Sequence, residues 1–147
     1  MARVKIKFPD DKPLYHCTIP VRIGDINYGG HAGNDSLLSI IHEARVQMLA
    51  HWGWTELDAG GNSLIMADVM IAYRGEAFYG EVLHVTLFAD EVTTQSFDLL
   101  YKITTSKDGQ PREILHAKTG MVCFDYQTRK IAGMEHQLRE RLNNATA

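Results

Sequence analysis

The stretch that decides the fold runs from Val21 to Trp52. It opens, at residues 21–34, with the sequence Val-Arg-Ile-Gly-Asp-Ile-Asn-Tyr-Gly-Gly-His-Ala-Gly-Asn, and it continues as a mostly apolar segment. Three of the five positions 29–33 are glycine. Such a loop can bend sharply and bring its backbone N–H groups close to a ligand. The first half of the stretch therefore predicts a ligand-binding loop.

A long helix is predicted directly after this loop. Asn34 is a good N-cap residue, and Gly53 follows the last apolar position. About 18 residues at 1.5 Å each would span roughly 27 Å, enough to cross a small domain. The apolar positions recur at helical spacing, with further apolar residues between them: Leu37, Ile41, Ala44, Met48 and Trp52. Because they extend beyond one narrow stripe, we expect other structure to cover most sides of the helix.

The rest of the chain reads mainly as strands. Residues 14–23 alternate well enough for a first strand, in which Pro20 indicates an edge position or a bulge. A turn cluster at 58–63 follows the helix. Four strands are then predicted at 64–73, 81–90, 95–105 and 112–125, and Asp108-Gly109 is a strong hairpin signal between the last two. A short helix at 134–142 and a frayed tail at 143–147 complete the chain.

This order of elements predicts the fold class. Successive strands with tight turns form an antiparallel meander, and a helix that is apolar on most sides must be covered by it. We therefore expect an α+β protein of one domain, residues 1–147, with a curved antiparallel sheet wrapped around one long helix. That is the shape of the hot-dog fold.

Composition excludes several classes of function. The net charge is −3, and the Lys and Arg residues form no basic stripe, so nucleic acid is not an expected partner. No run approaches the ~18 apolar residues of a membrane span, and no secretory leader is recognised, which predicts a cytoplasmic protein without a membrane partner. Cys17 and Cys123 are expected as reduced, buried thiols. No metal motif is present, and no cofactor is expected.

The sequence resembles the hot-dog acyl-CoA thioesterases, the group similar to 4-hydroxybenzoyl-CoA thioesterase. The family pattern is Asp, any residue, Asp, two residues, Gly-His, an Asn-rich helix start and a later Glu-Ala-Arg. Here the corresponding residues are 25–34 and Glu43-Ala44-Arg45. The segment 73–81 is similar to a second family stretch, Tyr-x-Arg-Pro-Ala-x-Tyr-Gly-Asp. The resemblance covers residues 15–125.

The resemblance implies hydrolysis of an acyl-CoA thioester to a carboxylic acid and CoA. It also implies three catalytic candidates. The second Asp of the pattern is the usual catalytic carboxylate, and here that position is Asn27, which can bind a carbonyl or a water but cannot act as a base. Asp25 or Glu43 would then activate the water. Their alternatives are structural: a turn-forming Asn27, a loop cap at Asp25, and a buried, paired Glu43.

Substrate-binding candidates surround the same loop. Backbone N–H groups at the positive end of the helix would stabilise the oxyanion of the reacting carbonyl. The residues expected to contact the substrate are Gly30, His31, Ala32, Gly33 and Asn34, together with Asp68 from a partner subunit and Arg74, which would bind a CoA phosphate. His31 has a second interpretation as a loop-ordering side chain, Asp68 as a solvent-facing strand residue, and Arg74 as a solvated turn residue.

A homo-oligomer is expected because the strand at 64–73 is too apolar for an exposed sheet edge. A dimer joined edge to edge is the minimum, and the resembled family often forms tetramers. Two other functions stay open. A non-catalytic acyl-CoA binding protein would explain the missing Asp, and a hot-dog dehydratase is the less favoured third reading, because Ala-Gly-Asn follows His31.

Overall fold

The predicted order of one strand, a long helix, four strands and a short helix is confirmed, with two further short elements at 23–25 and 130–131 that were not predicted. The computed structural model describes residues 1–143, so most of the predicted frayed tail lies outside the described residues. The elements are β1 (Tyr15–Pro20), the short 3-10 helix η1 (Ile23–Asp25), α1 (Asn34–His51), β2 (Ser63–Tyr73), β3 (Val82–Asp90), β4 (Ser96–Lys107), β5 (Gln110–Asp125), β6 (Lys130–Ile131) and α2 (His136–Asn143).

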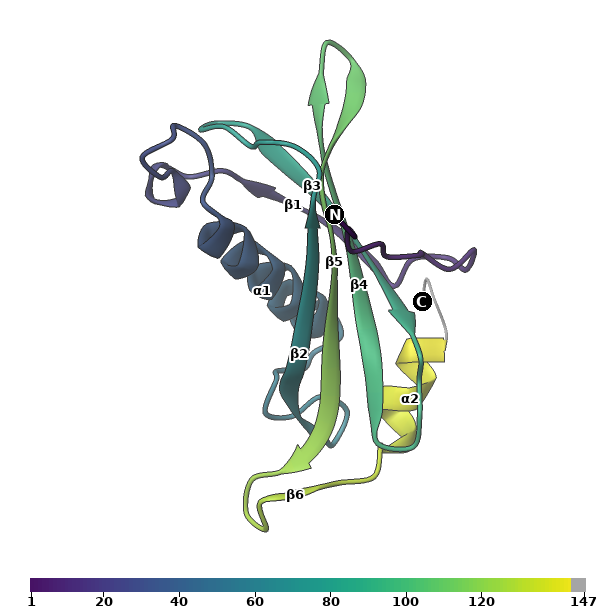
Figure 1. Ribbon diagram of the computed structural model, residues 1–147. Coiled ribbons are helices and arrows are strands. Elements are labelled where there is room, and N and C mark those ends of the chain that lie inside the picture. The colour runs from purple at the N-terminus through teal and green to yellow at the C-terminus, as the bar shows by residue number, and fades with distance from the viewer. Residues whose placement is uncertain (144–147) are drawn as a thin grey trace.

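The strands form one antiparallel sheet in the order β1-β3-β4-β5-β2, with the short β6 paired to β5. The sheet curves, and α1 lies along one face of it (Figure 1). The β4–β5 hairpin turns at Asp108 and Gly109, both with positive φ, as expected for this dipeptide. The predicted α+β hot-dog architecture is confirmed.

The core lies between α1 and the concave face of the sheet. Ile40, Ile41, Ala44 and Met48 of α1 are at most 1% exposed. The opposite side of α1 is open, with Ser39, Glu43, Val46 and Ala50 exposed among others. The expectation that other structure covers most sides of the helix is therefore wrong for this single chain, since the sheet covers only one side.

The first predicted strand is too long. β1 ends at Pro20, and residues 23–25 form η1 instead. The physical cause is local: Asp25 accepts hydrogen bonds from the backbone N–H and the side chain of Arg22, which closes a tight turn. Alternation of apolar residues up to Ile23 gave no sign of this capping pair.

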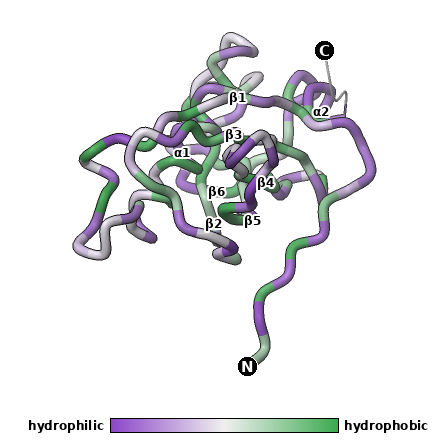
Figure 2. Tube along the Cα trace, turned by 90° about the horizontal axis from the view of Figure 1, so that it is seen from above, coloured by the Kyte–Doolittle hydropathy of each residue, from purple (hydrophilic) through white to green (hydrophobic). Residues whose placement is uncertain are grey.

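α2 packs beside the residues that follow the end of α1, and Figure 2 shows the two helices at separate positions around the strands. α2 contributes Leu138 and Leu142 to the core cluster, and Arg141 lies 5.7 Å over the ring of Trp52.

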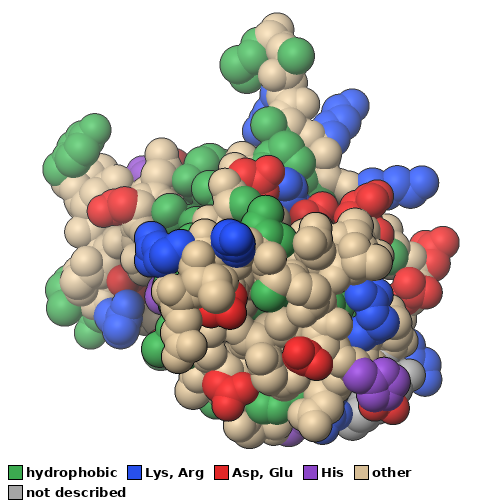
Figure 3. All heavy atoms as spheres, turned by 90° about the horizontal axis from the view of Figure 1, so that it is seen from below, with side chains coloured by type: hydrophobic (Ala, Val, Ile, Leu, Met, Phe, Trp, Pro, Cys, Tyr) green, Lys and Arg blue, Asp and Glu red, His purple; other side chains and the backbone are tan. Residues whose placement is uncertain are grey.

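On the outer face of the sheet, Phe8 of the N-terminal segment packs against the rings of Phe88 and His116. Figure 3 shows acidic and basic side chains interspersed on one face.

β2 is an edge strand with an apolar surface. Ile65, Met66 and Val69 are each 39–40% exposed, and β2 pairs with β5 on one side only.

The two cysteines are buried free thiols, as expected, and burial raises the pKa of each to about 11. Within residues 1–143 no helix is long and apolar enough to cross a membrane.

Candidate active site

The glycine loop is held in one shape by backbone hydrogen bonds. Asn27 N–H donates to the carbonyl of His31 (2.9 Å), and Gly33 N–H donates to that of Asp25 (2.9 Å). Ala32 N–H donates to the carbonyl of Ala77 (2.8 Å), in the connection between β2 and β3. The loop is therefore anchored to itself and to the sheet, directly before α1.

These bonds change which amides can meet a ligand. The sequence-based expectation placed the donors around Gly30 to Gly33, but the amides of Gly30, Ala32 and Gly33 all donate to carbonyls of this chain. The first-turn amides of α1, those of residues 34–36, have no acceptor within the described part of the chain. They point out of the helix N-terminus because a helix leaves its first N–H groups unsatisfied. Of the expected donors, the His31 amide alone has no acceptor within residues 1–143, and the amides of residues 34–36 add open donors at the start of α1.

Asn27 faces this helix start. Its Oδ1 accepts a hydrogen bond from Gly29 N–H (2.9 Å), which leaves its Nδ2 as a free donor group. Nδ2 lies 3.6 Å from the point where a Cβ of Gly33 would stand. Asn27 therefore both orders the turn and presents an N–H group toward the first turn of α1.

His31 and Asn34 have structural contacts of their own. His31 Nδ1 lies 3.0 Å from the carbonyl oxygen of Ala32, so the ring is held against the loop. The carbonyl of Asn34 accepts a hydrogen bond from the Tyr73 hydroxyl (3.4 Å), at the end of β2. This bond places the end of β2 beside the start of α1.

Asp25 is a buried structural carboxylate. It is 5% exposed, its Oδ2 accepts from Arg22 N (2.8 Å) and Nε (3.3 Å), and its Oδ1 accepts from the Arg22 guanidinium (3.2 Å). Burial raises the pKa of Asp25, but the hydrogen bonds and charge of Arg22 outweigh it, so the net pKa lies below its ordinary value. Both oxygens are occupied, which favours the loop-capping interpretation.

Glu43 lies about two turns further along α1 than Asp35. It is exposed and accepts a hydrogen bond from Gln47 (2.8 Å) on its own helix. Eight residues separate it from Asp35, or about 12 Å along the axis. Its charge contributes, after burial, to the raised pKa of the Cys17 thiol in β1, and it also contributes, after Asp25, to the raised pKa of Arg22. Glu43 forms no hydrogen bond or ion pair with a loop residue among residues 1–143, and its catalytic role stays a prediction.

Asp68 and Arg74 lie on and just after β2. Asp68 Oδ1 accepts from Lys118 Nζ (2.8 Å) and from Gly120 N–H (3.0 Å), next to a β-bulge, and these contacts lower its pKa, the Lys118 hydrogen bond most. Arg74 is exposed at the end of β2. Both substrate-binding roles stay predictions, and the Asp68 carboxylate is already hydrogen-bonded within its own chain.

One acidic residue beside the loop was not among the sequence candidates. Asp35 is the second residue of α1, and its Oδ1 lies 2.6 Å from the point where a Gly33 Cβ would stand. Burial raises the pKa of the Tyr73 phenol, and the charge of Asp35 raises it further. The signal in the sequence was the order Gly33-Asn34-Asp35, in which an acidic residue follows a glycine at a helix start.

A hollow of about 270 Å³ lies between α1 and β2. Its lining residues are Leu38, Ser39, His42, Arg45 and Met66. Arg45 forms its floor: this side chain is 6% exposed and donates to Glu56 (3.1 Å) and to the Tyr101 hydroxyl (3.2 Å). His42 lies 2.6 Å from the other Glu56 oxygen. The hollow has a mixed lining, with apolar Leu38 and Met66, polar Ser39 and His42, and the internally paired Arg45 at its base.

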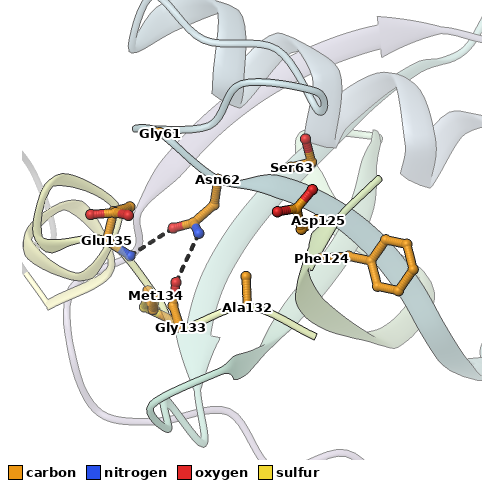
Figure 4. Close-up of a pocket in the computed structure, with 9 residues that line it drawn as sticks. All are labelled: Gly61, Asn62, Ser63, Phe124, Asp125, Ala132, Gly133, Met134 and Glu135. Atoms are coloured by element: carbon orange, nitrogen blue, oxygen red, sulfur yellow. Dashed lines mark hydrogen bonds between the residues drawn. The ribbon is translucent and has the colours of Figure 1, made fainter. Parts of the chain in front are cut away.

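A larger depression lies at the opposite end of the molecule and has a structural explanation. It is lined by residues 61–63, 124–125 and 132–135 (Figure 4). Asn62 spans it: its Nδ2 donates to the carbonyl of Gly133 (2.9 Å), and its Oδ1 accepts from Glu135 N–H (2.7 Å). Since both ends of the amide are used to hold the chain before α2, this depression presents no free chemical group from Asn62.

The described residues contain no group of three or more His, Cys, Asp or Glu that could hold a metal ion. The site is thus a loop, a helix start and a strand end: Asn27, the open amides of residues 34–36, Asp35 and Tyr73. A family model described as the thioesterase-like superfamily matches residues 21–142. The chain belongs to the thioesterase-like superfamily.

Three proteins named as thioesterases are similar to this chain in sequence or fold. The long-chain acyl-CoA thioesterase FadM of Escherichia coli is 28% identical over 127 residues, covering 84% of this chain and 93% of FadM. The probable thioesterase YbaW of Escherichia coli is 26% identical, with a TM-score of 0.72 over 90% of this chain and 98% of YbaW. Slr0204, a 1,4-dihydroxy-2-naphthoyl-CoA thioesterase of Synechocystis, shares the fold (TM-score 0.77, 20% identity, 88% and 96% covered).

Proposed function

We propose that the protein is an acyl-CoA thioesterase, which hydrolyses the thioester to a carboxylic acid and CoA. The observation that carries the proposal is the set of open amides at the start of α1, beside Asn27, in a chain of the thioesterase-like superfamily. FadM, a relative over most of the chain, acts on long-chain acyl-CoA, which supports this substrate class.

The start of α1 supplies the hydrogen-bond donors that polarise the thioester carbonyl. In the tetrahedral intermediate the carbonyl oxygen becomes an oxyanion, and the first-turn amides of α1 donate hydrogen bonds to it. The positive end of the helix dipole favours the same charge. Asn27 Nδ2 lies beside this position and donates to the carbonyl or to the attacking water.

The remaining substrate is placed around this centre. The acyl chain extends into the hollow between α1 and β2, where Leu38 and Met66 supply apolar contact. Residues 30–34 form the mouth, and Arg74, exposed beside it, is the candidate for a CoA phosphate. Two buried free thiols are usual in a reducing compartment and support a cytoplasmic location.

A panel of acyl-CoA esters, each incubated with the full chain and a thiol-reactive dye, tests this function. We expect release of one thiol per acid formed, at a rate that depends on acyl length, because the hollow is of limited size. Binding of an acyl-CoA without thiol release would support the alternative, a non-catalytic acyl-CoA binding protein. That alternative is favoured by one observation, the amide at position 27 in place of a carboxylate.

A homodimer joined through β2 is part of the proposal, because its exposed edge is apolar and unpaired on one side. Replacing Val69 with Lys is expected to convert the dimer to a monomer, since two like charges would meet across the edge. Sedimentation equilibrium measures this change. Lys at Val82, an equally exposed apolar residue of an interior strand, is the matched control and should leave the assembly intact. A wild-type chain that sediments as a monomer would contradict the dimer.

A further inference from the structure

A thioesterase that uses water needs a group to accept its proton, and the sequence candidates do not supply one at the helix start. Asn27 cannot act as a base. Asp25 is 5% exposed and has both oxygens bonded to Arg22. Glu43 lies about 12 Å further along α1 and bonds Gln47. The question is which carboxylate lies beside the open amides.

Asp35 is in that place. Asp35 Oδ1 lies 2.6 Å from the point where a Cβ added to Gly33 would stand. Asn27 Nδ2 lies 3.6 Å from the same point. The two side chains therefore flank Gly33 from the loop and from the helix. Asp35 is exposed, and its carboxylate takes part in none of the ion pairs formed by residues 1–143.

Tyr73, at the end of β2, is the third side chain beside the start of α1. Its hydroxyl donates to the Asn34 carbonyl, one residue before Asp35. The charge of Asp35 contributes, after burial, to the raised pKa of the Tyr73 phenol, so the two side chains are close enough to interact. Loop, helix and strand thus converge on the first turn of α1.

The glycine at position 33 fits the same arrangement. Any side chain there would place its Cβ 2.6 Å from Asp35 Oδ1, a separation that real Cβ atoms do not show, so Asp35 would have to turn away. Gly33 has φ −70°, which every residue type can adopt. The backbone does not require glycine here. Glycine leaves room for the Asp35 carboxylate in the rotamer that it adopts here.

We propose that Asp35 is the catalytic base of the thioesterase reaction, an inference that rests on the proposed function. Asp35 takes a proton from water as the water oxygen bonds to the thioester carbonyl carbon. When the tetrahedral intermediate collapses, the carbon–sulfur bond breaks, and the proton passes from Asp35 to the departing CoA sulfur. Water and acyl-CoA are consumed, and the acid and CoA thiol are formed. The carboxylate missing at position 27 is supplied from the other side of Gly33.

The test replaces Asp35 with Asn, which keeps the shape and removes the base. On the best acyl-CoA of the panel, kcat should fall about 100-fold or more, the usual contribution of a general base. Binding of a thioether analogue of acyl-CoA, which cannot be hydrolysed, should change less than about threefold, and the melting temperature should stay the same. Asp108→Asn, an equal change at an exposed hairpin turn, is the matched control and should leave kcat unchanged.

Each other result overturns part of the proposal. An Asp35→Asn variant that keeps kcat within threefold of wild type, or a Glu43→Gln variant that alone loses turnover, would overturn the role of Asp35 while the thioesterase function stands. Loss of kcat together with loss of analogue binding would overturn the base role in favour of a binding role. A wild-type chain that releases no thiol from any ester would overturn the proposed function and the role of Asp35 with it.

Discussion

Replacing Arg45 with Met is expected to lower the free energy of unfolding by about 3 kcal/mol. Arg45 is 5% exposed and donates to Glu56 and Tyr101 beneath the hollow between α1 and β2. Removing one member of a buried ion pair costs about 3–5 kcal/mol because the other charge stays without compensation. The expected loss is at the low end, since Glu56 keeps 28% of its side chain exposed and retains His42.

Urea denaturation of the two chains measures this loss. Lys102→Met is the matched control, because the Lys102–Glu113 pair lies on the surface, and its removal should change stability by about 0.5 kcal/mol or less. Adding Glu56→Gln to Arg45→Met should recover part of the loss by removing the unpaired carboxylate. Equal losses for Arg45→Met and Lys102→Met would mean that the buried network contributes nothing.

Replacing Gly60 with Ala is the second large change, with an expected loss of about 3 kcal/mol. Two independent costs add there. Gly60 has φ +62°, a left-handed conformation that costs an L-residue roughly 1–2 kcal/mol. The new Cβ would also lie 2.9 Å from the backbone nitrogen of Leu138 and 3.0 Å from the Trp54 ring, and such overpacking costs about 1–3 kcal/mol.

Gly53→Ala separates these two costs. Gly53 has φ +83°, but nothing lies within 4 Å of its added Cβ, so only the backbone cost of about 1–2 kcal/mol should appear. Thermal and urea unfolding of both variants measure the difference. Because the Gly60 collision involves the backbone of α2, the Gly60 variant should also lose protection from hydrogen exchange in α2. If hydrogen exchange in α2 is unchanged and the Gly60 and Gly53 variants lose equal stability, α2 moves away from the new Cβ without a cost in free energy.

The helix and the strands could be predicted because each has a simple local signal. The 3.6-residue spacing gave α1 nearly to the residue, and Asp108-Gly109 gave the hairpin. The prediction of Asn34 as the N-cap was wrong: Asn34 is the first residue of α1, and the N-cap is Gly33, which has no side chain to bond the helix amides. The predicted ends of β2, β3, β4, β5 and α2 differed from the structure by one or two residues, because backbone hydrogen bonding rather than composition decides where an element ends.

The site was harder to predict because its members come from three elements. Asn27 and the helix start were recognised, since they are neighbours in sequence. Tyr73 reaches Asn34 only through the pairing of β2 with β5, which a pattern of apolar residues does not specify. Asp35 was not among the site residues that the sequence indicated. Its relation to Gly33 depends on one rotamer, and spacing along the chain carries no information about it.

The two edge strands of the sheet are not equivalent, and this difference limits how far the sheet can extend by pairing with further copies of the chain. β2 offers a long apolar border, while β1 offers six residues that finish at Pro20, which has no N–H to donate. If two copies join through β2 about a twofold axis, both remaining borders are β1, and neither can recruit another strand as readily. Sheet extension then stops at a closed pair instead of continuing into a fibre.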